Sequence, residues 1–173
     1  RPLIGFCPGA EFGPAKRWPH YHYAELAKQL IDEGFQIVLF GSAKDHEAGN
    51  EILAALNTEQ QAWCRNLAGE TQLEQAVILI AACKAVVSND SGLMHVAAAL
   101  DRPLVALYGP SSPDFTPPLS HKARVIRLIS GYHKVRKGDA AEGYHQSLID
   151  ITPQRVLEEL NDLLLEKTEQ EED

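Results

Sequence analysis

Residues 84–109 read KAVVSNDSGLMHVAAALDRPLVALYG, and this stretch decides the fold. Two largely apolar runs, 84–90 and 103–109, flank an alanine-rich segment at 92–100. Neither run alternates regularly between polar and apolar residues, which is typical of strands that helices cover on both faces of a parallel sheet. The order strand, helix, strand therefore predicts a right-handed crossover between two parallel strands.

The same pattern continues on both sides of this stretch. Further strands are expected at 3–7, 35–41, within 62–69 and at 123–130. Further helices are expected at 20–33, 45–57, 73–83 and 152–167. The helix at 73–83 is apolar almost throughout, so we expect it to be largely buried, and the last helix begins at Thr152 as N-cap with Pro153 after it. The sequence predicts an α/β doubly wound fold with a mainly parallel, Rossmann-like sheet of about six strands.

Composition excludes several classes of protein. The chain has 173 residues, of which 45% are hydrophobic and 23% charged, which suits one ordinary domain. No apolar run reaches the roughly 20 residues that a membrane-spanning helix needs. The net charge is −8, and the tail at 166–173 supplies half of it with five acids and one lysine, so the rest is only mildly acidic. The charge therefore argues against a nucleic-acid partner, and we expect the tail to be disordered.

The cysteines and histidines give no sign of a metal site. Cys7, Cys64 and Cys83 are far apart and form no C-x-x-C motif, so we expect small buried residues in a reducing compartment. His20 and His22 match no metal-binding motif.

The start of the chain is unusual. It lacks an initiator methionine and a signal peptide, and it enters an apolar run almost at once. We expect a fragment of a longer protein.

The turn between 84–90 and 92–100 is the first candidate site. Asp90 ends the strand, and Ser91 and His95, four residues apart, share one side of the helix start. We expect Leu93, Val96, Ala97 and Leu100 to form the apolar stripe of this helix. The unpaired N–H groups and the dipole of a helix start attract anions, and Gly92 leaves room for close approach. A plain N-cap beside a surface histidine is the alternative, but a cap alone does not explain the glycine and the histidine together.

The loop PGAEFGPAKRWP at 8–19 is the second candidate. It matches neither G-x-G-x-x-G nor the P-loop pattern, which disfavours a nicotinamide or flavin cofactor and excludes a P-loop. Lys16 is its strongest phosphate candidate, because a lysine is a flexible point charge. The alternative is that Lys16 and Arg17 are a solvated pair and that Trp18 packs ahead of the next helix.

The turn FGSAKDHE at 40–47 is the third candidate. An acid near this position in a nucleotide-binding sheet commonly holds ribose hydroxyls. Glu47 and Asp45 both qualify, and either one could instead stabilise the first helical turn through the helix dipole. No G-x-S-x-G elbow surrounds Ser91, so a hydrolase is not indicated.

Together, KRWP, FGSAKDHE, LAGETQL, SNDSGLMHVAAALDRPLVALYGPSSP and the terminal helix resemble the C-terminal half of bacterial heptosyltransferases. These are GT-B enzymes that build the inner core of lipopolysaccharide. The resemblance covers essentially the whole chain, and the most specific block is D-[ST]-G-x-x-H-x-x-A-A-L at 90–100 when the lysine loop precedes it.

The resemblance implies a role for each candidate residue. Lys16 would contact the diphosphate of a nucleotide sugar, Glu47 the ribose and Thr71 the adenine. Asp90 would hold the heptose hydroxyls. The phosphate end would be lined by Ser91, Gly92 and His95. Relatives can carry hydroxyl residues where this chain has Glu11 and Phe12, so the role of that part of the loop in phosphate binding is left open.

The resemblance also implies a function and its partners. Residues 1–165 would be the donor-binding domain for ADP-heptose, and transfer to the lipopolysaccharide inner core would proceed with inversion. The family's proposed catalytic aspartate and the acceptor site belong to an N-terminal domain that this chain lacks, so we expect the chain alone to be inactive. No tightly bound cofactor is implied, and an external Mg²⁺ is left open. The location would be cytoplasmic, with peripheral contact at the inner face of the inner membrane left open.

Two alternatives remain at this point. The first is another GT-B enzyme, such as a uridine-donor transferase or a nucleotide-sugar epimerase. The second is a non-catalytic nucleotide-binding module. A comparison of ADP with UDP binding would separate the first, and a closed, self-capped rim beside Lys16, Glu47 and Asp90 would favour the second.

Overall fold

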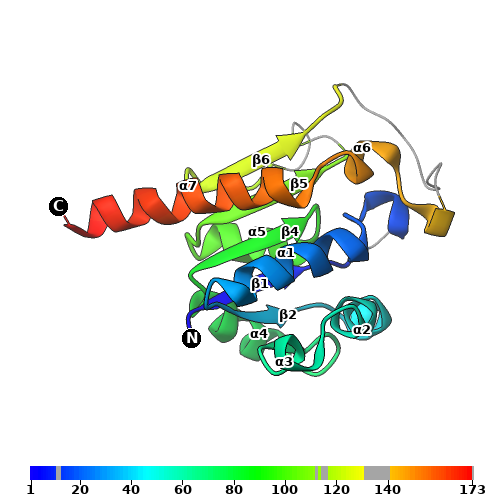
Figure 1. Cartoon of the computed structure of the whole chain (residues 1–173). Coiled ribbons are helices and arrows are strands. Elements are labelled where there is room, and N and C mark those ends of the chain that lie inside the picture. Colours follow the sequence, from blue (N-terminus) through cyan, green and yellow to red (C-terminus); the bar gives the residue numbers. More distant parts are fainter. Residues whose placement is uncertain (11–12, 112, 114–116, 131–140, 173) are drawn as a thin grey trace.

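The computed structural model describes residues 1–10, 13–111, 113, 117–130 and 141–172. Its centre is a six-stranded sheet with the strand order β3-β2-β1-β4-β5-β6 (Figure 1). Every neighbouring pair of strands is parallel. The strands are β1 (Leu3–Cys7), β2 (Gln36–Leu39), β3 (Cys64–Asn66), β4 (Ala85–Asn89), β5 (Leu104–Tyr108) and β6 (Ala123–Arg127).

Helices cover both faces of the sheet. In Figure 1, α1 and α7 lie in front of the strands, and α4 and α5 lie behind them. The helices are α1 (His20–Asp32), α2 (His46–Ala54), α3 (Thr58–Gln61), α4 (Leu73–Ala81), α5 (Gly92–Ala99), α6 (Gln146–Ile149) and α7 (Pro153–Glu172). Three short 3-10 turns complete the described elements: η1 (Pro14–Lys16), η2 (Ala43–Asp45) and η3 (Ala141–Gly143).

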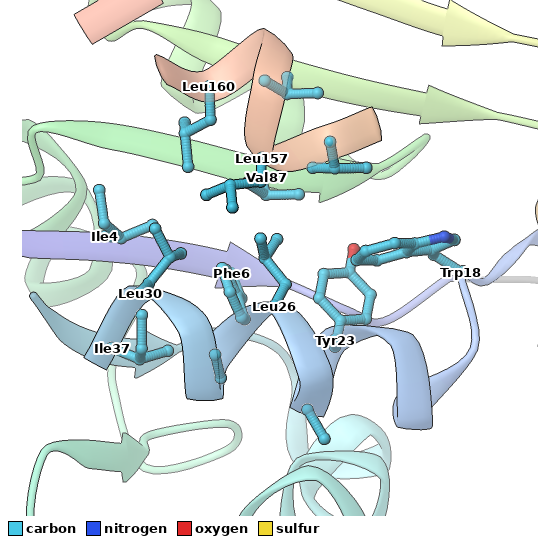
Figure 2. Packing of buried hydrophobic residues seen from close by; sticks show 14 of the residues in the cluster. Ile4, Phe6, Trp18, Tyr23, Leu26, Leu30, Ile37, Val87, Leu157 and Leu160 are labelled. Atoms are coloured by element: carbon cyan, nitrogen blue, oxygen red, sulfur yellow. The ribbon is translucent and has the colours of Figure 1, made fainter. Parts of the chain in front are cut away.

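Two hydrophobic cores, one on each face, hold this arrangement together. Ile4 and Phe6 of β1 point into the core under α1 and α7, where they meet Leu26 and Leu160 (Figure 2). Val86 of β4 belongs to the second core, which contains residues of α4 and α5. Successive side chains of a strand point to opposite faces, so strands buried on both sides must be apolar throughout. The predicted α/β doubly wound fold is confirmed.

The N-terminal cap of the last helix is also confirmed. The backbone N–H of Arg155 donates to Thr152 Oγ1 at 3.2 Å. The helix then continues to Glu172, so its bounds include residues 166–172 of the acidic tail. Glu, Gln and Lys are good helix formers, and the tail contains no Gly or Pro that would end the helix.

The burial of α4 differs from the prediction. Only Ala76 and Ile80 are buried within it, whereas Leu73 is 63% and Ile78 is 68% exposed. A helix packed on one face of a sheet buries one stripe, whatever residues occupy the rest of its surface.

The buried face of α5 is broader than predicted. Ala97 is buried, and Leu93, Val96 and Leu100 are partly buried against the same core, but Met94 and Ala98 are buried as well. Because this helix is apolar nearly all round, the spacing alone did not single out one face.

The cysteines behave as predicted from their spacing. Cys7, Cys64 and Cys83 are free and buried, and burial raises the pKa of each thiol to about 12. These thiols are therefore unreactive at neutral pH.

No helix in the described ranges combines the length and the apolar character needed to cross a membrane. Nor do the described residues gather three His, Cys, Asp or Glu side chains into a group that could hold a metal ion.

The start of α1 is tied to the segment between η3 and α7. Trp18 Nε1 donates to the Ile151 carbonyl at 2.8 Å. The His22 Nε2 atom lies 2.8 Å from the Ile149 carbonyl oxygen. Burial lowers the pKa of His22 from its ordinary value of 6.5, and the hydrogen bond to Ile149 opposes that shift in part. The neutral ring of His22 is therefore the form that the folded chain prefers.

This preference predicts how stability depends on pH. Below about pH 6.5 the unfolded chain binds a proton at His22 that the folded chain resists, so the free energy of unfolding falls as the pH drops through this range. Above it the ring is neutral in both states and its contribution is complete. We expect His22→Gln to lose less stability than the unmodified chain between about pH 7.5 and 5.5 in urea denaturation. The exposed His121, changed to Gln, controls for the replacement of a surface histidine. A slope for His22→Gln equal to that of the unmodified chain would contradict this account.

Candidate functional site

Four polar turns lie along one edge of the sheet because all strands are parallel and their carboxyl ends coincide. In Figure 1 the arrowheads point to the right, toward η1 and the start of α2. Thr71 follows β3, Glu47 follows β2, Lys16 follows β1 and Asp90 follows β4, and these four strands are consecutive in the sheet. Strands are about 4.8 Å apart, so the four turns span roughly 14 Å, which matches an extended ligand of several linked groups.

The position between β1 and β4 is the topological switch point. The chain winds outward from β1 to β2 and β3, then crosses over to β4 on the other side of β1. Crossovers on the two sides leave in opposite directions, so a crevice outside the carboxyl ends of β1 and β4 is the usual ligand position in such sheets. Lys16 and Asp90 flank this point.

The start of α5 offers backbone donors at the switch point. Ser91 occupies the N-cap position, yet no described side chain caps the helix. The Ser91 Oγ atom instead lies 3.2 Å from Ser88 Oγ. A Cβ placed on Gly92 would have no described heavy atom within 4 Å, and Gly92 and His95 are both exposed. Ser91 therefore holds the N-cap position without a side-chain cap, and His95 is a surface residue as the alternative stated. The N–H groups of the first turn can donate to an anion.

One side chain joins the turn after β4 to the loop after β1. Asn89, the last residue of β4, is fully buried. Its Oδ1 accepts hydrogen bonds from the Trp18 backbone N–H at 3.0 Å and the Tyr23 hydroxyl at 2.8 Å. Its Nδ2 donates to the carbonyls of Pro8 at 2.7 Å and Gly9 at 3.2 Å. All four hydrogen-bonding positions of the amide are therefore used.

A buried carboxylate joins the loop after β1 to the turn after β2. Asp45 Oδ2 accepts from the Ser42 N–H at 2.8 Å and from Ser42 Oγ at 3.0 Å. Its Oδ1 forms an ion pair with Arg17 Nη2 at 3.5 Å. A Cβ on Gly9 would lie 2.4 Å from this carboxyl group, and one on Gly41 would lie 2.8 Å from the Asp45 Cβ. Both glycines therefore make room for Asp45.

Backbone and histidine contacts join the turns after β2 and β3. The Gly69 N–H donates to the Gly41 carbonyl at 2.9 Å, and His46 Nδ1 lies 2.9 Å from the Ala68 carbonyl oxygen. Gly69 has a φ of +77°, and a Cβ there would come within 2.7 Å of the Ala43 Cα. Only glycine combines this backbone conformation with this close approach.

These contacts decide between the two candidate acids. The Asp45 carboxylate is buried and occupied by Ser42 and Arg17. Glu47 lies exposed in the first turn of α2. Glu47 is thus the acid that a ligand can reach.

The remaining predicted residues also lie at this edge. Lys16 ends η1 and is partly exposed. Thr71, between β3 and α4, is partly exposed as well. The solvated-pair alternative is wrong for Arg17, which is paired with Asp45, whereas Trp18 packs in the core as that alternative stated. Glu11 and Phe12 lie outside the described residues.

Sequence reasoning missed the contacts that hold the four turns together. The sequence analysis treated Asn89 only as part of an apolar strand, although a polar side chain in a buried strand needs hydrogen-bond partners. Asp45 follows Ser42 at the spacing of a capping box, a signal that the sequence does contain. Nothing in the sequence indicates that Arg17 reaches Asp45, because that contact depends on the strand order.

The sequence of the chain matches a known protein family. Residues 1–145 match the profile of glycosyltransferase family 9 (heptosyltransferase). The chain belongs to glycosyltransferase family 9. It is 93% identical over 167 residues to lipopolysaccharide heptosyltransferase 2 of Escherichia coli K12 and 68% identical over 165 residues to lipooligosaccharide heptosyltransferase 2 of Haemophilus influenzae, covering 96% and 95% of this chain. The resemblance to heptosyltransferases is confirmed.

Solved structures of the family share the fold. The structure of E. coli ADP-heptose lps heptosyltransferase II matches with a TM-score of 0.90 and 87% identity, over 97% of this chain and 48% of that one. The structure of E. coli heptosyltransferase WaaC with ADP matches with a TM-score of 0.71 and 26% identity, over 93% of this chain and 44% of that one. This family 9 chain spans about half the length of the curated relatives it matches, 48% for the E. coli and Haemophilus proteins.

The close approach of Gly9 to the Asp45 carboxyl group gives a testable prediction about stability. We expect Gly9→Ala to push the Asp45 carboxylate away from Ser42 and Arg17 and to lower the free energy of unfolding by about 1–3 kcal/mol. Gly92→Ala is the matched control, because a Cβ there meets open space; its effect should stay within about 0.5 kcal/mol. Urea denaturation of both variants measures the difference, and equal stabilities would show that Asp45 does not need the space.

Proposed function

We propose that this chain is the donor-binding half of a heptosyltransferase, and that it holds ADP-heptose while a hydroxyl of the lipopolysaccharide inner core attacks the sugar. The single observation that carries the proposal is the 93% identity to lipopolysaccharide heptosyltransferase 2 over nearly the whole chain. The row of four turns supports it, since their order along the sheet follows the order of groups in a nucleotide sugar.

Each turn then takes one part of the donor. Thr71 lines the adenine, the exposed carboxylate of Glu47 accepts from the ribose hydroxyls, and Lys16 contacts the diphosphate. Asp90 accepts hydrogen bonds from the heptose hydroxyls at the switch point. The phosphate nearest the sugar meets the open start of α5, which is formed by Ser91, Gly92 and His95.

In the proposed reaction, residues of this site would stabilise ADP as the leaving group. The acceptor oxygen forms a bond to the anomeric carbon from the face opposite the diphosphate, and the bond from that carbon to the phosphate oxygen breaks, which inverts the configuration. The electron pair of the broken bond goes to ADP. Lys16 and the N–H groups of α5 would stabilise the negative charge that develops there.

Other parts of the reaction belong outside this chain. The base that takes the acceptor proton and the acceptor site itself would lie in the N-terminal domain, so the chain alone would bind donor without transferring heptose. A Mg²⁺ ion, if one takes part, would arrive with the diphosphate, because the described residues form no cluster of three ligands for it. The setting would be the cytoplasm, with the acceptor presented at the inner face of the bacterial inner membrane.

Calorimetric titration of the chain with ADP-heptose, ADP and UDP tests the proposal. We expect binding of ADP-heptose and ADP, and binding of UDP at least tenfold weaker. A preference for UDP would point to a uridine-donor transferase or an epimerase instead. Absence of binding to all three nucleotides would contradict the proposal.

Asp90 provides the finer test of the site. We expect Asp90→Ala to lose most of the extra affinity that the heptose contributes while ADP binding stays within about threefold of the unmodified chain, because a lost side-chain hydrogen bond affects only the group it contacts. The exposed Asp162 on α7, changed to Ala, serves as the control and should bind both ligands as before. Equal losses for ADP and ADP-heptose in Asp90→Ala would contradict the assignment of Asp90 to the sugar.

A further inference from the structure

The side chain of Asn89 connects the end of β4 to the loop after β1. Its amide bonds to Pro8 and Gly9, where the chain leaves β1, and to the Trp18 N–H, where the chain enters α1. Both ends of the segment that carries Lys16 are thus held by one side chain. The next residue along the chain is Asp90.

A hydrogen bond also holds the main chain at Asn89. Ser88 Oγ donates to the Asn89 carbonyl at 2.7 Å and lies 3.2 Å from Ser91 Oγ. Ser88 and Asn89 are fully buried, so these bonds form in a medium of low dielectric constant where unmet polar groups are costly. The position of Asp90 therefore follows from the bonds of the residues before it.

Trp18 makes the other end of this connection rigid. Its backbone N–H donates to Asn89, its indole N–H donates to Ile151, and its ring packs edge-on against Tyr23 with the centroids 4.8 Å apart. Lys16 lies two residues before this anchor. A shift of the Asn89 amide would consequently move the end of the lysine segment relative to Asp90.

We propose that Asn89 is a positioning residue that sets the separation between Lys16 and Asp90, and so makes the site fit a diphosphate and its attached sugar together. This inference rests on the proposed function. Asn89 itself is buried beneath the site and acts through Lys16 and Asp90.

The test compares two variants of the same hydrogen-bond network. Asn89→Ser removes the bonds to the loop, whereas Tyr23→Phe removes one bond to the same amide and leaves the loop contacts in place. We expect ADP-heptose to bind Asn89→Ser at least tenfold more weakly than the unmodified chain, and Tyr23→Phe within threefold of it, by calorimetry under conditions where circular dichroism shows both to be folded. Affinity within twofold of the unmodified chain for Asn89→Ser, or equal losses for both variants, would overturn the inference.

Amide hydrogen exchange of the unmodified chain provides a second test in case Asn89→Ser does not fold. The Trp18 N–H should exchange as slowly as the Phe40 N–H, which is bonded inside the sheet to the Phe6 carbonyl. Exchange of Trp18 at least a hundredfold faster than Phe40 would show that Asn89 does not hold the loop, and would overturn the inference.

Failure of the proposed function has a different signature. If the unmodified chain binds neither ADP nor ADP-heptose, the donor assignment fails, and with it the part of the inference that concerns the ligand. Slow exchange of Trp18 in the unmodified chain and faster exchange in folded Asn89→Ser would still show that Asn89 positions the loop.

Discussion

All six strands run in the same direction, and this constraint determines where the polar residues of the chain can meet. A parallel sheet requires each connection to cross one face, so every carboxyl end lies at the same edge. Four turns that are far apart in sequence become neighbours there, in the order of β3, β2, β1 and β4. The apolar cores on both faces keep the strands in this order, and the site depends on them although no core residue is expected to touch a ligand.

Buried polar groups then convert neighbouring turns into a defined arrangement. Asn89 holds the turn after β4 to the loop after β1, Asp45 holds that loop to the turn after β2, and Gly69 and His46 hold that turn to the next. Each contact satisfies groups that would be costly to bury alone, which makes a single arrangement favourable. The side chains left exposed, Glu47 and His95 among them, are the ones proposed to meet the donor.

The family assignment and the geometry support each other at different levels. The match to glycosyltransferase family 9 over residues 1–145 states which proteins the chain is related to. The geometry supports the proposed donor site, because all four turns lie at the carboxyl edge of one sheet. In the proposed function, the acceptor and the base would belong to the part of such proteins that this chain does not span.

The sequence by itself determined the α/β class, most of the helix and strand positions, the Thr152 cap and the motif residues at the strand ends. Those features follow from local patterns: apolar runs, caps and the spacing of a few polar residues. The tertiary structure alone decided that Asp45 is occupied and Glu47 accessible, that Arg17 is paired, that α4 exposes Leu73 and Ile78, and that Asn89 joins two distant segments. Each of these depends on which strands are neighbours and on which face of a helix meets the sheet, and such long-range contacts leave no periodic signal in the sequence around the residues that make them.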